Sequence, residues 1–404
     1  MTALALLLLL PCLVLLVPVG VVCAQVALAC LPRRPEAEAG TGPRPRLTVL
    51  VPAHNERDGI ARTLRSVRPQ LREGDRLLVV ADNCDDDTAD IARAEGASVV
   101  ERQHASDRGK GFALAFGVEQ LRAAPPDVLV VIDADCEIGA QALDRLARAC
   151  ARSGRPAQAL DLMTRPDGAG VGLRVAEFAW RVKNWVRPRG GSAMGWPCPL
   201  MGTGMALPWP LVESARLAHG HLAEDMQLGV DLALAGHAAV FCEAATVVSQ
   251  FPLSKKDQDS QRTRWEHGHL GTIRQQLPAL LKAAWARRDG RLLAMALDLS
   301  VPPLALLVML VVALWLAALA LRLAGGAPAV AWYAANGLCA ALLAAVLLAW
   351  AVWGRAVLRP WDLLGIPWYV ASKLGLYLRF WTRPQRQWVR TGRHPGDQGP
   401  AGPT

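Results

Sequence analysis

Three long apolar segments limit most strongly what this chain can fold into. They cover residues 3–31, 299–321 and 328–353, and each reaches the roughly 20 residues that a membrane-spanning helix needs. A backbone inside lipid must satisfy its own hydrogen bonds, so each segment predicts a helix. The first segment is far longer than the ~7–15 residue core of a cleavable signal, and no basic residue precedes it. We therefore expect residues 1–31 to be a retained N-terminal transmembrane helix.

Basic residues beside these segments predict their orientation, because lysines and arginines collect on the cytoplasmic side of a membrane. The connection between the second and third segments holds only Arg322. The other flanks hold more basic residues, namely Arg33, Arg34, Arg44, Arg46, Lys282, Arg287, Arg288, Arg291, Arg355 and Arg359. We expect a multi-pass protein of the inner or plasma membrane of a bacterium, with the long middle region in the cytoplasm.

Composition narrows the possible partners. The net charge of +9 could suggest nucleic acid, but much of the excess flanks the apolar segments, where anionic membrane lipid accounts for it. We therefore expect no nucleic-acid partner. The nine cysteines are odd in number and form no CxxC pair, so neither a disulfide framework nor a zinc site is indicated. A reducing cytoplasm is consistent with this pattern.

The middle region alternates strand-like and helix-like segments. Strand-like runs at residues 47–51, 77–80, 99–100 and 128–132 are separated by helical patterns, which favours an α/β fold with a mostly parallel sheet. The predicted organisation adds a linker over 32–45, an α/β domain over 46–270, an interfacial helical segment over 271–298, two transmembrane helices within 299–353, an amphipathic or re-entrant membrane element over 354–391 and a disordered tail over 392–404.

Polar clusters follow three of these strand-like runs, where open α/β sheets bind ligands. They are residues 52–56, 82–88 and 133–135, and the last two are rich in aspartate. A single cluster could be a helix cap. A dinucleotide fingerprint is missing, a Walker loop fails because Gly111 follows Lys110, and an EF-hand fails at Arg93. A metal-bridged nucleotide diphosphate remains, held in part by the Asp133-Ala134-Asp135 pattern.

These motifs carry a resemblance when they are taken in order. The segments VPAHNE, ADNCDDDT, Gly109-Lys110-Gly111, DADC, Glu224-Asp225 and Gln261-Arg262-Thr263-Arg264-Trp265 resemble those of family 2 glycosyltransferases with the GT-A fold, over about residues 46–270. The similarity is greatest to the membrane-anchored branch that includes cellulose, chitin and hyaluronan synthases and ceramide glucosyltransferase. The resemblance implies a nucleotide-sugar-binding domain with a mostly parallel, Rossmann-like sheet.

The resemblance also implies a donor site. Asp82 would contact the uracil and ribose of a UDP-sugar, Asp133 the ribose and sugar side, and Asp135 a Mg²⁺ or Mn²⁺ ion on the diphosphate. Pro52, Glu56 and Lys110 would complete this donor site.

Catalysis needs a base for the acceptor hydroxyl, and Asp225 matches the position of the family's catalytic aspartate. Ala223 stands where the family usually has threonine. The resemblance places further residues against the diphosphate or the acceptor, namely Gln261, Arg264, Trp265, Gly202, Thr203 and Glu224. Two structural interpretations stay open: acids in a first helical turn also suit the helix dipole, and arginine with tryptophan also anchors an interfacial helix.

A single base without a second nucleophilic carboxylate favours an inverting transfer. We expect a lipid-linked or saccharide acceptor in cell-envelope or exopolysaccharide biosynthesis, with possible partner subunits, because three helices cannot easily enclose a saccharide channel. The alternatives are a processive β-polysaccharide synthase, a non-catalytic nucleotide-sugar sensor and a metal-dependent phosphohydrolase.

Overall fold

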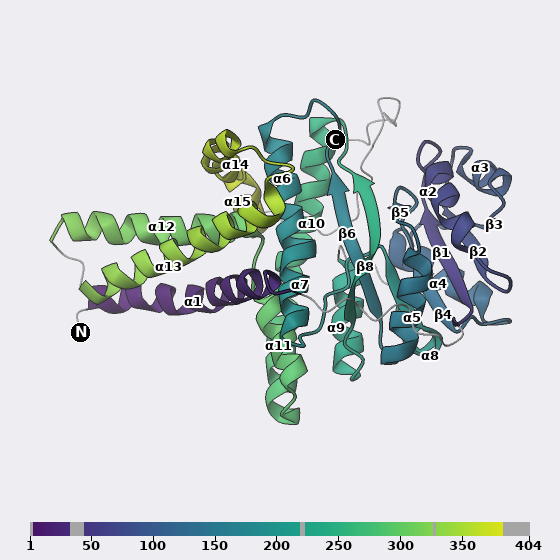
Figure 1. The fold of residues 1–404 in the computed structure, drawn as a ribbon, viewed down its shortest axis with the longest axis horizontal. Helices are drawn as coiled ribbons and strands as arrows, with labels where there is room; N and C mark the ends of the chain where they lie inside the picture. Colours follow the sequence, from purple (N-terminus) through teal and green to yellow (C-terminus); the bar gives the residue numbers. More distant parts are fainter. Residues whose placement is uncertain (1–2, 33–43, 219–222, 326–328, 383–404) are drawn as a thin grey trace. The chain divides into compact units, whose positions relative to one another are not determined.

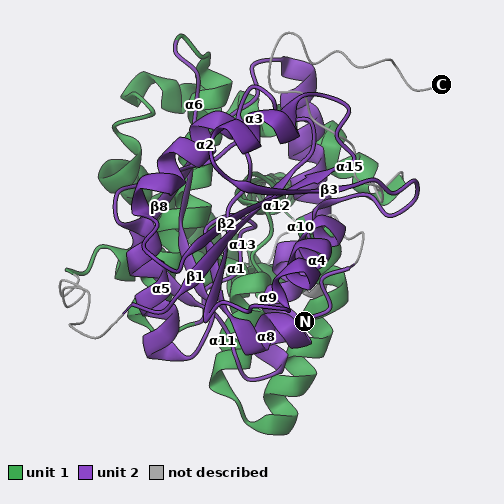
Figure 2. Cartoon of the chain, turned by 90° about the vertical axis from the view of Figure 1, so that its right-hand side faces the viewer, with its two compact units in different colours: residues 1–32, 168–196, 269–384 green, residues 33–167, 197–268, 385–404 purple. Residues whose placement is uncertain are grey.

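The computed structural model describes residues 3–32, 44–218, 223–325 and 329–382. The chain forms two compact units (Figure 2). The helical unit contains residues 1–32, 168–196 and 269–384, and the α/β unit contains residues 33–167, 197–268 and 385–404. Most of the predicted linker and the whole predicted tail lie outside the described residues.

The α/β unit is built on an eight-stranded sheet with the order β3-β2-β1-β4-β7-β6-β8-β5. Its strands are β1 (Leu47–Ala53), β2 (Arg76–Asp82), β3 (Ser98–Arg102), β4 (Val128–Val131), β5 (Glu137–Ile138), β6 (Ala157–Thr164), β7 (Met205–Pro208) and β8 (Val240–Gln250). The four strands β3, β2, β1 and β4 are parallel neighbours, whereas β7 runs antiparallel to both β4 and β6. The prediction of an α/β fold is confirmed, with a mixed sheet.

Helices cover both faces of this sheet, which explains why its central strands are almost wholly apolar. Successive strand residues point to opposite faces, so Val49 packs against one helical layer and Leu50 against the other. The layer on the Val49 side contains α2 (Ile60–Val67), α3 (Thr88–Ala94) and α5 (Ala142–Ser153). The layer on the Leu50 side contains α4 (Lys110–Leu121), α8 (Trp209–Ser214) and α9 (Glu224–Leu234).

The carboxyl ends of β1 and β2 turn sharply into polar loops. Asn55 and Asn83 follow them with φ angles of 54° and 53°, a left-handed conformation that asparagine tolerates better than most residues. The Asn83 amide side chain donates a hydrogen bond of 3.1 Å to Asp82. The predicted donor-site residues Glu56 and Asp82 lie beside these turns, at the carboxyl ends of β1 and β2.

The helical unit contains the three apolar segments as helices. These are α1 (Ala3–Ala29), α12 (Leu304–Leu323) and α13 (Ala329–Ala349), which run alongside one another (Figure 1). Residues Leu8–Ala29, Leu304–Leu323 and Ala329–Gly354 are long and apolar enough to cross a membrane. The remaining helices are α6 (Val171–Arg181), a π-helical stretch (Val182–Val186), α7 (Arg187–Ala193), α10 (Lys255–Arg287, shared by both units), α11 (Gly290–Leu299), a π-helical stretch (Trp350–Gly354), a 3-10 helix (Pro360–Gly365), α14 (Ile366–Ser372) and α15 (Leu374–Thr382).

A buried polar cluster joins α1 to α7 and α11 inside the helical unit. Arg187 donates to Gln25 Oε1 at 2.8 Å and to Asp298 Oδ1 at 2.9 Å, and Gln25 Nε2 donates to Asp298 at 2.7 Å. Gly190 allows this close packing, because a Cβ there would lie 1.8 Å from the Gln25 carbonyl oxygen. Residues 168–196 therefore cluster with the apolar helices, although they fall inside the range predicted for the α/β domain.

Candidate functional site

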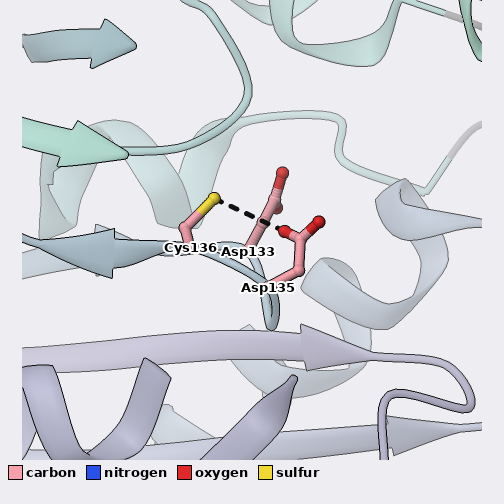
Figure 3. A group of neighbouring side chains, drawn as sticks. All are labelled: Asp133, Asp135 and Cys136. Atoms are coloured by element: carbon pink, nitrogen blue, oxygen red, sulfur yellow. Dashed lines mark hydrogen bonds between the residues drawn. The ribbon is translucent and has the colours of Figure 1, made fainter. Parts of the chain in front are cut away.

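The end of β4 presents the two aspartates of the Asp133-Ala134-Asp135 pattern. Ligand atoms of Asp133, Asp135 and Cys136 lie within 4.8 Å of one another (Figure 3). The turn is fixed by Thr63, whose hydroxyl donates to the Ala134 carbonyl at 2.8 Å. Figure 3 shows the Cys136 sulfur directed at the Asp135 carboxylate, with a hydrogen bond of 3.4 Å. Burial raises the pKa of the Cys136 thiol well above its ordinary value, so it donates as a neutral thiol.

Lys110, at the start of α4, is the central cation of the site. Its ammonium group contacts the Asp133 carboxylate and donates a hydrogen bond of 2.9 Å to the Gly202 carbonyl. Burial alone would lower the pKa of Lys110, but the charges of Asp133, Glu224 and Asp225 outweigh this effect and raise the pKa. Lys110 is therefore charged at neutral pH and links the end of β4 to the loop before β7.

The loop before β7 is held in place from the sheet side. Thr203 accepts a hydrogen bond of 3.1 Å from the Asp133 backbone N–H through its hydroxyl, and its carbonyl accepts one of 2.8 Å from the buried Gln158 side chain. Gln158 also accepts from the Met201 N–H at 2.9 Å. Gly202 has a φ of +91°, and a Cβ there would lie 3.3 Å from Asp225 Oδ2. The loop thus brings its backbone against the predicted base.

Glu224 and Asp225 form the first turn of α9, beside Lys110. Together with residues such as Leu217 they line a cavity of about 10 Å³, which has room for about one water molecule. Burial raises the pKa of Glu224 from 4.5 to about 7, and the neighbouring negative charge of Asp225 adds to this shift, whereas Lys110 opposes it. Glu224 therefore keeps its proton to a higher pH than an ordinary glutamate does.

Gln261 and Arg264 lie one turn apart on α10, so they share a face of that helix. The Gln261 side chain is 1% exposed, and among the described residues none accepts a hydrogen bond from its Nε2. Burial lowers the pKa of the Arg264 guanidinium, against the raising effect of Glu224, Asp133 and Asp225. Since an arginine remains charged at neutral pH, it adds a second cation near these three acids.

Asp82, at the end of β2, is engaged in a different set of contacts. Its carboxylate accepts a hydrogen bond of 2.6 Å from Arg102 at the end of β3, and Arg102 also donates to the Asp107 carbonyl at 2.8 Å. The Arg102 guanidinium lies 5.8 Å from the ring centre of Phe112. Asp82 is separated from β4 by the intervening β1.

The remaining predicted residues have fewer described contacts. The Glu56 carboxylate approaches the β4 turn, because a Cβ on Gly59 would lie 3.5 Å from Glu56 Oε2 and 3.4 Å from the Ala134 carbonyl oxygen. The Glu56 N–H donates to the Thr88 hydroxyl at 2.8 Å. Pro52 lies within β1, and Trp265 follows Arg264 on α10. The side chains of Pro52 and Trp265 are both partly buried.

The structure therefore brings together Lys110, Asp133, Gly202, Thr203, Glu224, Asp225 and Arg264. Two residues that contact predicted site residues were missed in the sequence: Arg102, which donates to Asp82, and Gln158, which donates to the Thr203 carbonyl. Arg102 could have been found by applying the strand-end rule to β3 as well. Gln158 could have been found as the one amide inside the apolar run of β6, where a buried polar group needs partners.

Comparisons with known proteins identify the family to which the chain belongs. The model of the family described as "Glycosyltransferase like family 2" matches residues 43–268, more than half of the chain. The low-salt glycan biosynthesis hexosyltransferase Agl6 of Haloferax volcanii is 34% identical over 25% of this chain and 24% of its own length. An uncharacterized glycosyltransferase of Mycobacterium bovis is 33% identical over 37% of this chain and 58% of its own length. The chain thus spans less than two thirds of the length of each of these relatives.

A solved structure supports the same fold. The mannosyltransferase PcManGT of Pyrobaculum calidifontis, solved with GDP-mannose and Mn²⁺, superposes with a TM-score of 0.50 and 19% sequence identity over 92% of this chain and 99% of its own length. The expected GT-A fold is therefore confirmed. With the family model matched over most of the α/β unit, the chain belongs to glycosyltransferase family 2.

Proposed function

We propose that this protein is an inverting, metal-dependent glycosyltransferase that moves a sugar from a UDP-sugar to a lipid-linked or membrane-proximal acceptor. One observation carries the proposal. Lys110 contacts Asp133 of the predicted donor site and the Gly202 carbonyl, and Gly202 lies against Asp225, the predicted base. The residues predicted to bind the donor and to accept the proton are thus neighbours, as a displacement on a bound nucleotide sugar requires.

The donor set at the end of β4 fits a hard divalent ion. Asp133 and Asp135 offer carboxylate oxygens, the ligands that Mg²⁺ and Mn²⁺ prefer, whereas Cys136 is a neutral thiol and a poor ligand. Asp135 would hold the ion, and the bound ion would supply positive charge to the diphosphate. PcManGT binds Mn²⁺, which agrees with a divalent cofactor for this chain.

The remaining residues have roles around the departing diphosphate. Arg264 and Gln261 would donate hydrogen bonds to it, and the unsatisfied Nε2 of Gln261 is a donor suited to a phosphate oxygen. Asp225 would take the proton of the acceptor hydroxyl. The acceptor oxygen then bonds to the anomeric carbon while the bond from that carbon to the diphosphate breaks, which inverts the anomeric centre.

Glu224 is the competing candidate for the base. Its pKa of about 7 lies where a general base is most effective at neutral pH. We favour Asp225 as the base because its carboxylate lies beside Gly202. A Cβ on Gly202 would lie only 3.3 Å from Asp225 Oδ2, and the Gly202 carbonyl accepts a hydrogen bond from Lys110, which also contacts Asp133. Replacing each acid separately distinguishes the two roles.

The three apolar helices support a membrane-proximal acceptor. We infer that all three span the membrane, with the α/β unit on the cytoplasmic side, and that the product enters cell-envelope or exopolysaccharide assembly. The Agl6 relative is named for glycan biosynthesis, which agrees with this role. A processive synthase remains the second candidate, and it would yield a distribution of polymer lengths where single transfer yields one product mass.

The first test measures nucleotide diphosphate release by the detergent-purified full chain. The panel contains several UDP-sugars and GDP-mannose, with lipid extract as acceptor, with and without EDTA. Asp225→Asn should lower the turnover rate about 100-fold or more. The matched control is Asp231→Asn, an exposed acid on the same helix, which should retain wild-type turnover.

Metal-dependent release with one donor, lost in Asp225→Asn and kept in Asp231→Asn, would support the proposal. A larger loss in Glu224→Gln than in Asp225→Asn would transfer the base role to Glu224. Thermal stabilisation by a nucleotide sugar without any release would instead indicate the sensor, and release of inorganic phosphate from UDP would indicate a phosphohydrolase.

A further inference from the structure

The helical unit has an open surface hollow of about 580 Å³ that no part of the proposed reaction uses. It is lined by residues 194–196, which follow α7, and by residues 287–291 with Ala294, which form the junction of α10 and α11. Its lining joins two segments about 90 positions apart in the sequence, so it exists only in the folded helical unit.

The hollow carries a strong positive charge. Arg287, Arg288 and Arg291 line it and are exposed, and Asp289 is the only acid among its lining residues. The Asp289 carboxylate accepts a hydrogen bond of 2.8 Å from the Arg291 backbone N–H and thereby caps α11. Arg288 and Arg291 thus place two exposed guanidinium groups beside one carboxylate that is already engaged, and this charge suits the hollow to an anion.

The backbone holds these arginines in a defined arrangement. Arg288 has a φ of +51°, and its N–H donates to the Trp285 carbonyl at 3.3 Å where α10 ends. The next N–H, that of Asp289, donates to the Ala284 carbonyl at 3.1 Å. Such bonds close a helix C-terminus and fix the direction in which the following chain leaves. The arginines therefore stand on a tight turn between two helices.

The surroundings of the hollow indicate a membrane surface. Trp285 is 88% exposed, and Leu281 and Leu293 are 44% and 45% exposed on the same two helices. Tryptophan and arginine collect together at the headgroup level of a bilayer. Moreover, α11 lines the hollow with its first half and ends at Leu299, and the candidate span α12 begins at Leu304, so only α11 and a short connection separate the hollow from that span along the chain.

We propose that this basic hollow binds the phosphate group of a membrane lipid. The guanidinium fork matches phosphate oxygens with paired hydrogen bonds, and Trp196 adds a flat apolar wall for the glycerol end of the headgroup. The exposed Trp285, Leu281 and Leu293 favour a phosphate that arrives on a lipid over one dissolved in water. The proposal is independent of the proposed glycosyl transfer.

The test titrates lipid against the full chain in detergent and counts bound lipid by native mass spectrometry. The probes are dioleoylphosphatidylglycerol, dioleoylphosphatidylcholine and glycerol 3-phosphate. The test variant is the double change Arg288→Gln with Arg291→Gln. The matched control is Lys282→Gln, an exposed cation on α10 that does not line the hollow. A second variant, Arg288→Lys with Arg291→Lys, keeps the positive charge and replaces each guanidinium group by an ammonium group.

We expect one tightly held phosphatidylglycerol in the wild type and in Lys282→Gln. The double glutamine variant should bind it at least about tenfold more weakly, because it loses charge-assisted hydrogen bonds, and the double lysine variant should bind with intermediate affinity. Equal binding of phosphatidylcholine, or unchanged affinity in the double glutamine variant, would overturn the proposal. Displacement of the lipid by equimolar glycerol 3-phosphate would overturn the lipid source and assign the hollow to a soluble phosphate.

Discussion

Replacing Glu224 by glutamine should stabilise the protein, and only at neutral and alkaline pH. Burial and the charge of Asp225 raise the pKa of Glu224 from 4.5 to about 7 in the folded protein. The folded state therefore holds this proton more tightly than the unfolded state does. By linkage, the stability falls as the pH rises from about 4.5 to about 7, and the full penalty is present above that range. Glutamine keeps the shape of the side chain and carries no charge to bury.

The magnitude follows from the same two pKa values. An interval from 4.5 to about 7, at about 1.36 kcal/mol per pH unit, gives at most about 3 kcal/mol of unfolding free energy. For a unit of roughly 200 residues, 1 kcal/mol moves the unfolding midpoint by about 2–4 °C. Glu224→Gln should thus raise the midpoint by up to roughly 10 °C at pH 8.5 and leave it nearly unchanged at pH 4.5.

The assay is thermal unfolding of the detergent-solubilised full chain at both pH values, with EDTA and without nucleotide. Glu213→Gln is the matched control, because Glu213 is exposed on α8 of the same unit and its charge stays solvated. It should show no gain at either pH. A gain for Glu224→Gln that is equal at pH 4.5 and pH 8.5, or a loss at pH 8.5, would refute the reasoning that desolvation and the Asp225 charge penalise the ionised form of Glu224.

Two further predictions concern the neighbours of this acid. Lys110→Met removes the cation that contacts Asp133. Because this loss is equivalent to one charge-assisted hydrogen bond, kcat/KM should fall about 10- to 100-fold. Steady-state kinetics would contradict this prediction if kcat/KM of the variant stayed within twofold of the wild-type value. Gly202→Ala places a Cβ 3.3 Å from Asp225 Oδ2 at a φ of +91°, whereas Gly236→Ala, the matched control, has a φ of +93° and open space around the new Cβ. Both variants should lose about 1–2 kcal/mol of stability, but only Gly202→Ala should lose turnover, about 10-fold. Equal turnover in the two variants would show that the contact between Gly202 and Asp225 does not matter for catalysis.

Local patterns in the sequence determined much of the architecture. The apolar runs at residues 47–51 and 128–132 became buried parallel strands, and the three apolar segments became helices long enough to cross a membrane. The spacing of Asp133 and Asp135 placed both carboxylates on one turn. These features could be predicted because hydrophobic periodicity and strand ends are properties of a few consecutive residues.

Contacts between distant segments were decided only by the tertiary structure. Lys110 meets Asp133 and Gly202 across 23 and 92 positions, and the turn at Arg288 shares a hollow with Trp196. Residues 168–196 pack with the apolar helices because Gly190 and Arg187 fit against Gln25, although their sequence gives no sign of this partner. No periodicity encodes such pairings, since they depend on how whole strands and helices pack and on which side chains then share the same buried space.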